Sequence, residues 1–181
     1  MEKVFLILSF LPRYWTSYFL KKFPNFFFRK ERIVRAIYSE KNINQKNNTL
    51  KANFVQFRYN PKTGKNELSS NRFELETIEN CRLLGRLNED PQYDRNYYGL
   101  ACIGVSSIKE FQEYTLKFTP VLDSEPKNYS HCDIYDDSIP LIQVGQALPP
   151  TVSYQKEQFK KRWHPYRDNG DLSFVKKQIQ P

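Results

Sequence analysis

The chain has little of the residue chemistry that most metal and redox sites require: two histidines, three cysteines and one methionine among 181 residues. The cysteines Cys81, Cys102 and Cys132 are widely spaced, odd in number, and form no C-x-x-C pair. This spacing argues against a disulfide framework and favours a reducing, cytoplasmic location. We predict that all three thiols are buried and unreactive.

Signature motifs and long apolar runs are also missing. The chain has no P-loop, GxGxxG, HExxH, DFG or GxSxG element, which argues against nucleotide-cofactor enzymes, and we expect no cofactor. The uncharged apolar run at 4–11 is eight residues long, whereas a helix needs about 20 to cross a bilayer. No small-residue cleavage site follows that run, so we do not expect a secretion signal.

Positive charge is concentrated at the two ends of the chain. Residues 1–35 carry eight basic and two acidic side chains, and residues 155–181 carry seven basic and three acidic ones. The middle carries thirteen basic and fifteen acidic side chains. Cationic ends suit a polyanion such as nucleic acid or an anionic lipid surface, and they also promote solubility.

The pattern predicts a single α+β domain with a small, mainly antiparallel sheet and one or two helices. Aromatic residues make up 15% of the chain, which argues against disorder through the middle. We divide the chain into an N-terminal aromatic and basic appendage at 1–30, a core at 31–154 and a basic tail at 155–181. The appendage either packs on the domain or a partner, lies in a membrane interface, or extends the chain without packing.

Local patterns predict several elements of the core. Alternating residues on both sides of a Pro-Lys-Thr-Gly turn predict a hairpin over 52–76. Apolar residues from Ile78 to Leu87 recur at helical spacing. A buried strand is predicted over 99–105, followed by a helix that Ser106 or Ser107 caps. Extended segments are expected at YTLKFTPVLDSEP, SHCDIYD and PLIQVGQALPP, and a helix from about 151 or 153 to Trp163.

The segment NYSHCDIYDD holds the first candidate site. His131 and Asp133 are two residues apart and share a face of an extended segment, as metal ligands on strands do, and Asp136 and Asp137 follow. A first-row metal usually needs a second histidine or more carboxylates, and the only other histidine, His164, lies in the basic tail. The alternative to a metal ligand is that His131 has a structural role beside a turn. We predict no metal site. Arg35, Arg72, Ser69 and His131 are instead candidate catalytic residues for phosphoryl chemistry, with arginines holding the phosphate and His131 as acid or base.

Basic residues interleaved with aromatic residues form the second candidate site. Such segments hold phosphates while the rings stack on bases. The candidate nucleic-acid-binding residues are Arg29, Lys30, Lys160, Lys161, Arg162, Trp163 and Arg167.

The motif Arg35-Ala36-Ile37-Tyr38-Ser39, the segment Glu67-Leu68-Ser69 with Arg72, and Pro126-Lys127-Asn128 with His131 and Ile134 resemble a loose family of small uncharacterised bacterial proteins. The resemblance covers residues 35–135, and the chain departs from the pattern at Ser70 and Cys132. The resemblance implies that these positions recur among the family members, but it implies no catalytic activity. It also places residues 1–30 outside the domain that the family shares.

Three functions follow as hypotheses. We favour a binding or accessory module whose basic ends contact nucleic acid or a partner protein bound to it. The alternatives are a small phosphodiesterase or nuclease-like enzyme centred on His131, Arg35 and Arg72, and a peripheral membrane protein anchored by residues 3–28.

Overall fold

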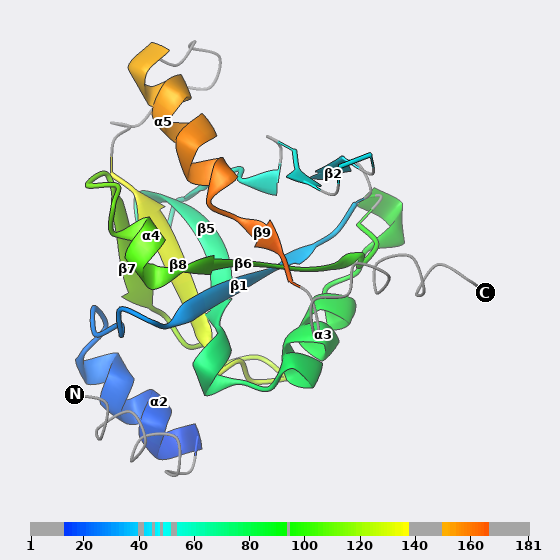
Figure 1. Ribbon diagram of the computed structural model, residues 1–181. Helices are drawn as coiled ribbons and strands as arrows, with labels where there is room; N and C mark the ends of the chain where they lie inside the picture. Colours follow the sequence, from blue (N-terminus) through cyan, green and yellow to red (C-terminus); the bar gives the residue numbers. More distant parts are fainter. Residues whose placement is uncertain are drawn as a thin grey trace.

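The computed structural model describes residues 13–39, 42–44, 46–47, 49–51, 54–93, 95–137 and 150–166, with side chains from residues 18 and 155 onward in the first and last of these segments. Within them the chain forms an antiparallel sheet of seven strands with helices on both faces, which confirms the predicted α+β class (Figure 1). The predicted extended segment at 140–149 lies outside the described residues.

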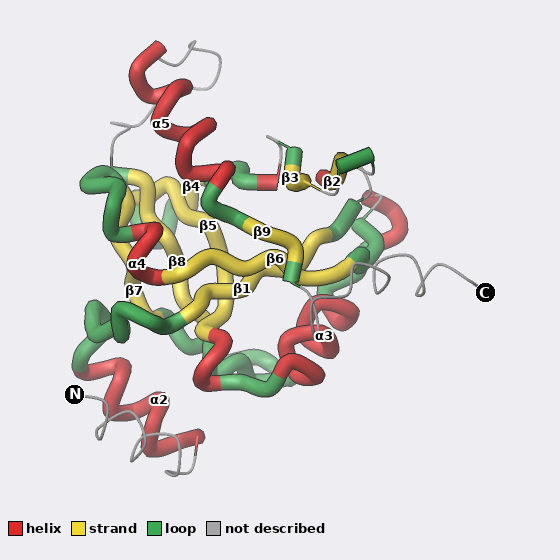
Figure 2. Tube along the Cα trace, in the orientation of Figure 1, coloured by secondary structure: helices red, strands yellow, loops and turns green. Residues whose placement is uncertain are grey.

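The elements follow in a simple order along the chain. They are α2 (Arg13–Lys22), β1 (Arg32–Ile37), the short pair β2 (Ile43–Asn44) and β3 (Thr49–Leu50), β4 (Arg58–Asn60), β5 (Lys65–Arg72), η3 (Phe73–Leu75), α3 (Ile78–Leu87), η4 (Pro91–Tyr93), β6 (Gly99–Gly104), α4 (Val105–Ile108), β7 (Tyr114–Phe118), β8 (His131–Asp136), α5 (Pro150–Lys161) and β9 (His164–Pro165). The sheet order is β7-β8-β5-β1-β6-β9, and β4 pairs with β5 beside this path (Figure 2).

One face of the sheet carries the main apolar core. Alternation along each strand sends Leu68, Leu116 and Ile134 to this face, where they are buried opposite one another. Helices α2 and α5 contribute Leu20 and Phe159 to the same cluster. The sheet is therefore closed on this side by segments from both ends of the described chain.

The other face is covered over β1 and β6 by α3. Val34 and Leu100 pack there against Cys81, and burial raises the pKa of that thiol to about 12, so it stays protonated. Thr77 caps the helix by accepting a hydrogen bond from the backbone N–H of Asn80. On the β5 and β8 side this face carries polar side chains instead, and they open toward a cleft.

Two local predictions need correction. The hairpin is present, but its first strand begins only at Arg58, because residues 54–57 form no strand and the rings of Phe54 and Phe57 pack into the core. The helix after the buried strand is α4, which begins at Val105 with Gly104 as a cap that makes no side-chain hydrogen bond. Neither Ser106 nor Ser107 is its cap, since both already lie inside the helix.

Residues at both ends of the described chain pack into the domain. Leu20 and Phe27 belong to the core on the N-terminal side, and Phe159 and Trp163 belong to it on the C-terminal side. Strand β9 extends the sheet by pairing with β6. Residues 155–166 therefore fold with the core, although the sequence alone groups them with a charged tail.

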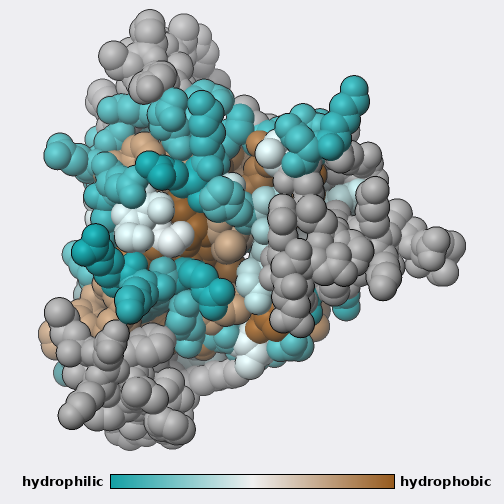
Figure 3. Space-filling model, in the orientation of Figure 1, coloured by the Kyte–Doolittle hydropathy of each residue, from teal (hydrophilic) through white to brown (hydrophobic). Residues whose placement is uncertain are grey.

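None of the helices among the described residues is long and apolar enough to cross a membrane. Hydrophilic side chains cover most of the described surface in the view of Figure 3, and an apolar area lies between them near the centre.

Candidate functional site

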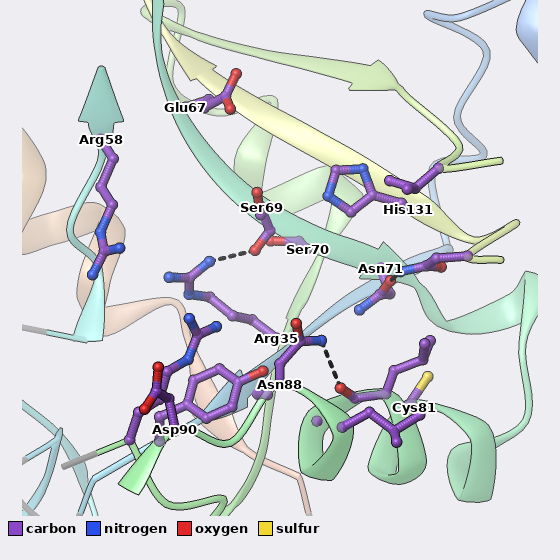
Figure 4. Close-up of a pocket in the computed structure, with 18 of the residues that line it drawn as sticks. Arg35, Arg58, Glu67, Ser69, Ser70, Asn71, Cys81, Asn88, Asp90 and His131 are labelled. Carbon is purple, nitrogen blue, oxygen red and sulfur yellow. Dashed lines mark hydrogen bonds between the residues drawn. The ribbon is translucent and has the colours of Figure 1, made fainter. Parts of the chain in front are cut away.

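The candidate site begins at a gap in the sheet beside β5. One edge of β5 pairs with β8 from Asn66 to Asn71. The other edge is shared, since β4 pairs with residues 65–67 and β1 only with residues 71–72. None of the described strands pairs with this edge at residues 68–70 of β5. In this gap, Arg35 Nη1 donates a hydrogen bond to the backbone oxygen of Ser69 (Figure 4).

The gap opens into a polar cleft with a volume of about 1100 Å³. Side chains from β1, β4, β5, β8, α3 and the loop after α3 line it. Figure 4 shows Arg35 and Arg58 on one side, with Ser69 and His131 along the strands above α3. Residues distant in the sequence therefore share one solvent-facing hollow.

Three arginines line the cleft from three different elements. Arg35 comes from β1, Arg58 from β4, and Arg95 from the loop before β6, where a backbone bridge to Asp90 holds it. Burial, with Arg58 and Arg95 nearby, lowers the pKa of Arg35 to about 10, against an opposing effect of Tyr38. Its guanidinium is still charged at neutral pH, and its buried Nε has no hydrogen-bond partner among the described atoms.

The acids that line the cleft, Glu67, Asp90 and Glu125, have partners other than its arginines, and Glu125 Oε1 lies 3.8 Å from Lys127 Nζ. Glu67 accepts hydrogen bonds from Asn60 at 2.7 Å and from the Thr63 hydroxyl at 3.3 Å, which close the β4–β5 turn. Asp90 accepts one from the backbone N–H of Gln92 at 3.2 Å. Within the described part of the chain, no carboxylate forms an ion pair with any of the three arginines. Their positive charge is therefore available to a ligand.

Aromatic rings flank the guanidinium groups. Arg95 lies over the Tyr38 ring at 4.2 Å from its centroid, and Arg35 lies 5.9 Å from the Phe54 ring centroid. Tyr93 also lines the cleft and is 81% exposed, so its ring faces solvent. Flat, exposed rings beside cations are suited to stacking on planar groups such as nucleobases.

His131 is held at the cleft wall by a defined network. Its Nδ1 lies 2.7 Å from the backbone oxygen of Thr119, which can only accept, so Nδ1 carries the proton in the neutral ring. The Thr119 hydroxyl and the Ser69 hydroxyl donate to Asp133 at 2.7 and 3.2 Å. Nε2 is left as the acceptor, 3.8 Å from Asp133 Oδ1.

The structure separates the predicted catalytic residues. Arg35, Ser69 and His131 line the cleft together, but Arg72 does not. Arg72 is fully buried on the core face, where its Nη2 donates to Glu31 Oε2 at 2.7 Å and its Nε also pairs with Glu31. The assignment of Arg72 to the site is therefore wrong, since no substrate can reach it.

The sequence patterns do not predict Arg58, Arg95 or Tyr93 as residues of the site. Arg58 stands in a strand pattern that looks like any half-exposed edge, and Arg95 and Tyr93 stand in a polar loop. Nothing local distinguishes them from ordinary surface residues, because their shared position depends on how β4 and the loop before β6 meet β1.

Three of the predicted nucleic-acid-binding residues, Lys160, Arg162 and Trp163, are paired or buried within the domain. Trp163 is 3% exposed and packs against Phe54 and Phe159, so its ring cannot stack on a base, which corrects that prediction. Arg162 pairs with Glu110 at 2.6 Å and Lys160 with Glu157 at 3.3 Å. Lys161, at the end of α5, and Arg29 and Lys30, in the loop between α2 and β1, are exposed. Arg167 lies outside the described residues.

Comparisons with known proteins identify no relative. No protein-family model, curated protein or solved structure matches the chain. Within the described residues there is also no group of three or more histidine, cysteine, aspartate or glutamate side chains arranged to hold a metal ion. The geometry of the cleft is therefore the main guide to function.

Proposed function

We propose that the protein is a nucleic-acid-binding module that holds a single strand in the cleft beside β5. The observation that carries the proposal is the convergence of Arg35, Arg58 and Arg95 on one hollow without carboxylate partners among the described residues. Guanidinium groups match phosphate geometry, and the exposed ring of Tyr93 provides a surface on which a base can stack.

The cleft supports this function better than the basic ends do. Arg162 and Lys160 are already paired with acids of the chain, and Trp163 is buried. By contrast, Arg58 is exposed and has neither a hydrogen bond nor an ion pair from its side chain within the described residues. An arginine without an existing ion pair breaks no interaction when it binds a phosphate, so its charge contributes more to the binding free energy than that of a paired arginine.

The first prediction concerns the cleft arginines. Arg58→Ala and Arg95→Ala each weaken binding to a labelled single-stranded RNA about tenfold at low salt and reduce the slope of log K against log salt by about 1, because each removes one phosphate contact. Fluorescence anisotropy over a salt series measures both quantities.

The control is Lys161→Ala, which removes an exposed charge from the end of α5 and leaves affinity within about twofold, because exposed charges away from the cleft contribute only screened attraction. Absence of RNA and DNA binding by the unmodified protein at low salt contradicts the proposal. So does a result in which Lys161→Ala loses affinity while both arginine variants keep it.

A second candidate function, phosphodiester hydrolysis in the same cleft, is favoured by the hydrogen bond that fixes the His131 tautomer. In this scheme a water attacks phosphorus, Nε2 accepts the water proton, the bond to the leaving oxygen breaks, and that oxygen takes a proton from solvent. Arg35 balances the charge of the phosphorane, and Asp133 stabilises the imidazolium.

The second prediction tests this candidate. If the cleft hydrolyses RNA, His131→Gln lowers the cleavage rate of a fluorophore-quencher oligonucleotide by at least about 100-fold, which is the usual contribution of a positioned base, while anisotropy shows unchanged binding. Lack of cleavage by the unmodified protein, or equal rates for the two proteins, excludes the enzyme and leaves the binding function standing.

A further inference from the structure

Helix α2 presents an aromatic surface that the cleft does not use. Tyr18, Phe19 and Phe23 are 49%, 37% and 52% exposed, although large apolar side chains are normally buried. The rings of Phe19 and Phe23 lie 5.0 Å apart, one turn from each other. Three exposed rings within six residues concentrate apolar surface in one short segment, and such a concentration in soluble proteins marks an interaction surface.

The patch is fixed to the domain rather than carried on a loose end. Leu20, which follows Phe19 in the same helix, is 1% exposed and belongs to the core cluster. The backbone N–H of Phe23 donates to the oxygen of Leu20, and Phe27 follows into the core. Figure 2 shows α2 at the lower end of the molecule.

Positive charge borders the rings, and no acid of the same segment offsets it. Residues 3–30 contain six lysines and arginines and no aspartate or glutamate. Lys21, Lys22 and Arg29 are exposed, and Lys22 Nζ lies 5.0 Å from the centroid of the Tyr18 ring. The next acid along the chain, Glu31, is buried against Arg72 and does not neutralise this surface.

We propose that the α2 surface, formed by Tyr18, Phe19, Lys21, Lys22 and Phe23, docks the protein on an anionic lipid bilayer. Aromatic rings are stable at the headgroup level, and adjacent lysines are attracted to the negative surface, which is the pattern of interfacial helices. A ten-residue helix that is anchored in the core through Leu20 lies on the bilayer and does not cross it. A protein partner matched to this surface would need an acidic rim, and a nucleic acid would engage the lysines without covering two phenylalanine rings.

The experiment is vesicle flotation with the full chain. We expect the protein to float with vesicles of equal parts phosphatidylcholine and phosphatidylglycerol and to stay in the dense fraction with phosphatidylcholine alone. Phe19→Ser with Phe23→Ser, and separately Lys21→Glu with Lys22→Glu, each reduce the floated fraction about tenfold, because binding needs both apolar burial and charge. Thermal unfolding followed by circular dichroism confirms that both variants remain folded.

The matched control is Leu83→Ser on α3, which removes an apolar side chain of similar exposure, 51%, from another surface and leaves flotation unchanged. Failure of the unmodified protein to float overturns the proposal, as does equal flotation with neutral vesicles or of either double variant. Loss of RNA binding in the α2 variants without loss of flotation also overturns it, since the surface then serves a nucleic acid.

Discussion

Arg72→Met destabilises the protein by about 3–5 kcal/mol, because it leaves the carboxylate of Glu31 buried without its counter-charge. Both side chains of this pair are 0% exposed, and Phe27 and Phe118 lie against the guanidinium at 4.4 and 5.4 Å from their ring centroids. The backbone N–H of Phe28 still donates to Glu31 at 3.2 Å, but one hydrogen bond does not replace a cation. Urea unfolding measures the loss as a lower midpoint.

The double variant Glu31→Leu with Arg72→Met recovers most of this loss, since two apolar side chains of similar volume leave no buried charge. Burial raises the pKa of Glu31 above its ordinary value of 4.5, against the lowering effect of Arg72. A raised pKa means that the folded state binds the proton more tightly than the unfolded state. Arg72→Met removes the lowering effect of the guanidinium, so the pKa of Glu31 rises further in the variant than in the unmodified protein. The stability deficit of the variant therefore narrows as the pH falls toward 4.5, where its buried carboxyl group becomes neutral. A loss below about 1 kcal/mol, or a double variant as unstable as the single one, contradicts the assignment.

Phe159→Ala lowers the free energy of unfolding by about 3–5 kcal/mol, because it opens a cavity in an aromatic cluster of the core. Phe159 is 0% exposed, and its ring centroid lies 4.2 Å from that of Tyr114 and 5.4 Å from that of Phe111. These partners come from β7 and the turn before it, so the substitution detaches α5 from the sheet. Urea unfolding monitored by tryptophan fluorescence reports the change, since Trp163 packs beside Phe159.

Lys161→Ala, two residues further along the same helix, is the control and changes stability by no more than about 0.5 kcal/mol, because its side chain is exposed. If Phe159→Ala were equally mild, residues 155–166 would behave as a tail and not as part of the domain. A large effect in Phe159→Ala alone identifies this segment as an integral part of the core.

The sequence predicts some residues of the cleft correctly and misplaces another. The chemistry of Arg35, Ser69 and His131 predicts them as site residues, and all three line the hollow. The same reasoning predicts Arg72, which lies on the opposite face of β5, because residues alternate sides along a strand and position 72 follows Leu68 and Ser70 into the core. Charge type is visible in a sequence, but the face that a charge occupies depends on strand register.

Trp163 illustrates the same limit at the C-terminal end. The segment KKRWHPYR is predominantly polar, and its composition favours a solvated, phosphate-binding tail. In the fold, β9 pairs with β6 and α5 lies over the core, which buries the indole against Phe54. That pairing joins residues about sixty positions apart, Cys102 and His164, and no local pattern encodes such a contact.

The sequence by itself determined the alternating strand β5, the extended segments that hold β7 and β8, the helical spacing of α3 and the α+β class, because these depend on patterns within a few residues. Only the tertiary structure decided that β4 and β1 share an edge of β5 and leave a gap, which brings Arg58 and Arg95 beside Arg35. It also decided which charges are buried, paired or exposed. These outcomes follow from long-range strand pairing and packing, which are set by the whole chain and not by any one segment.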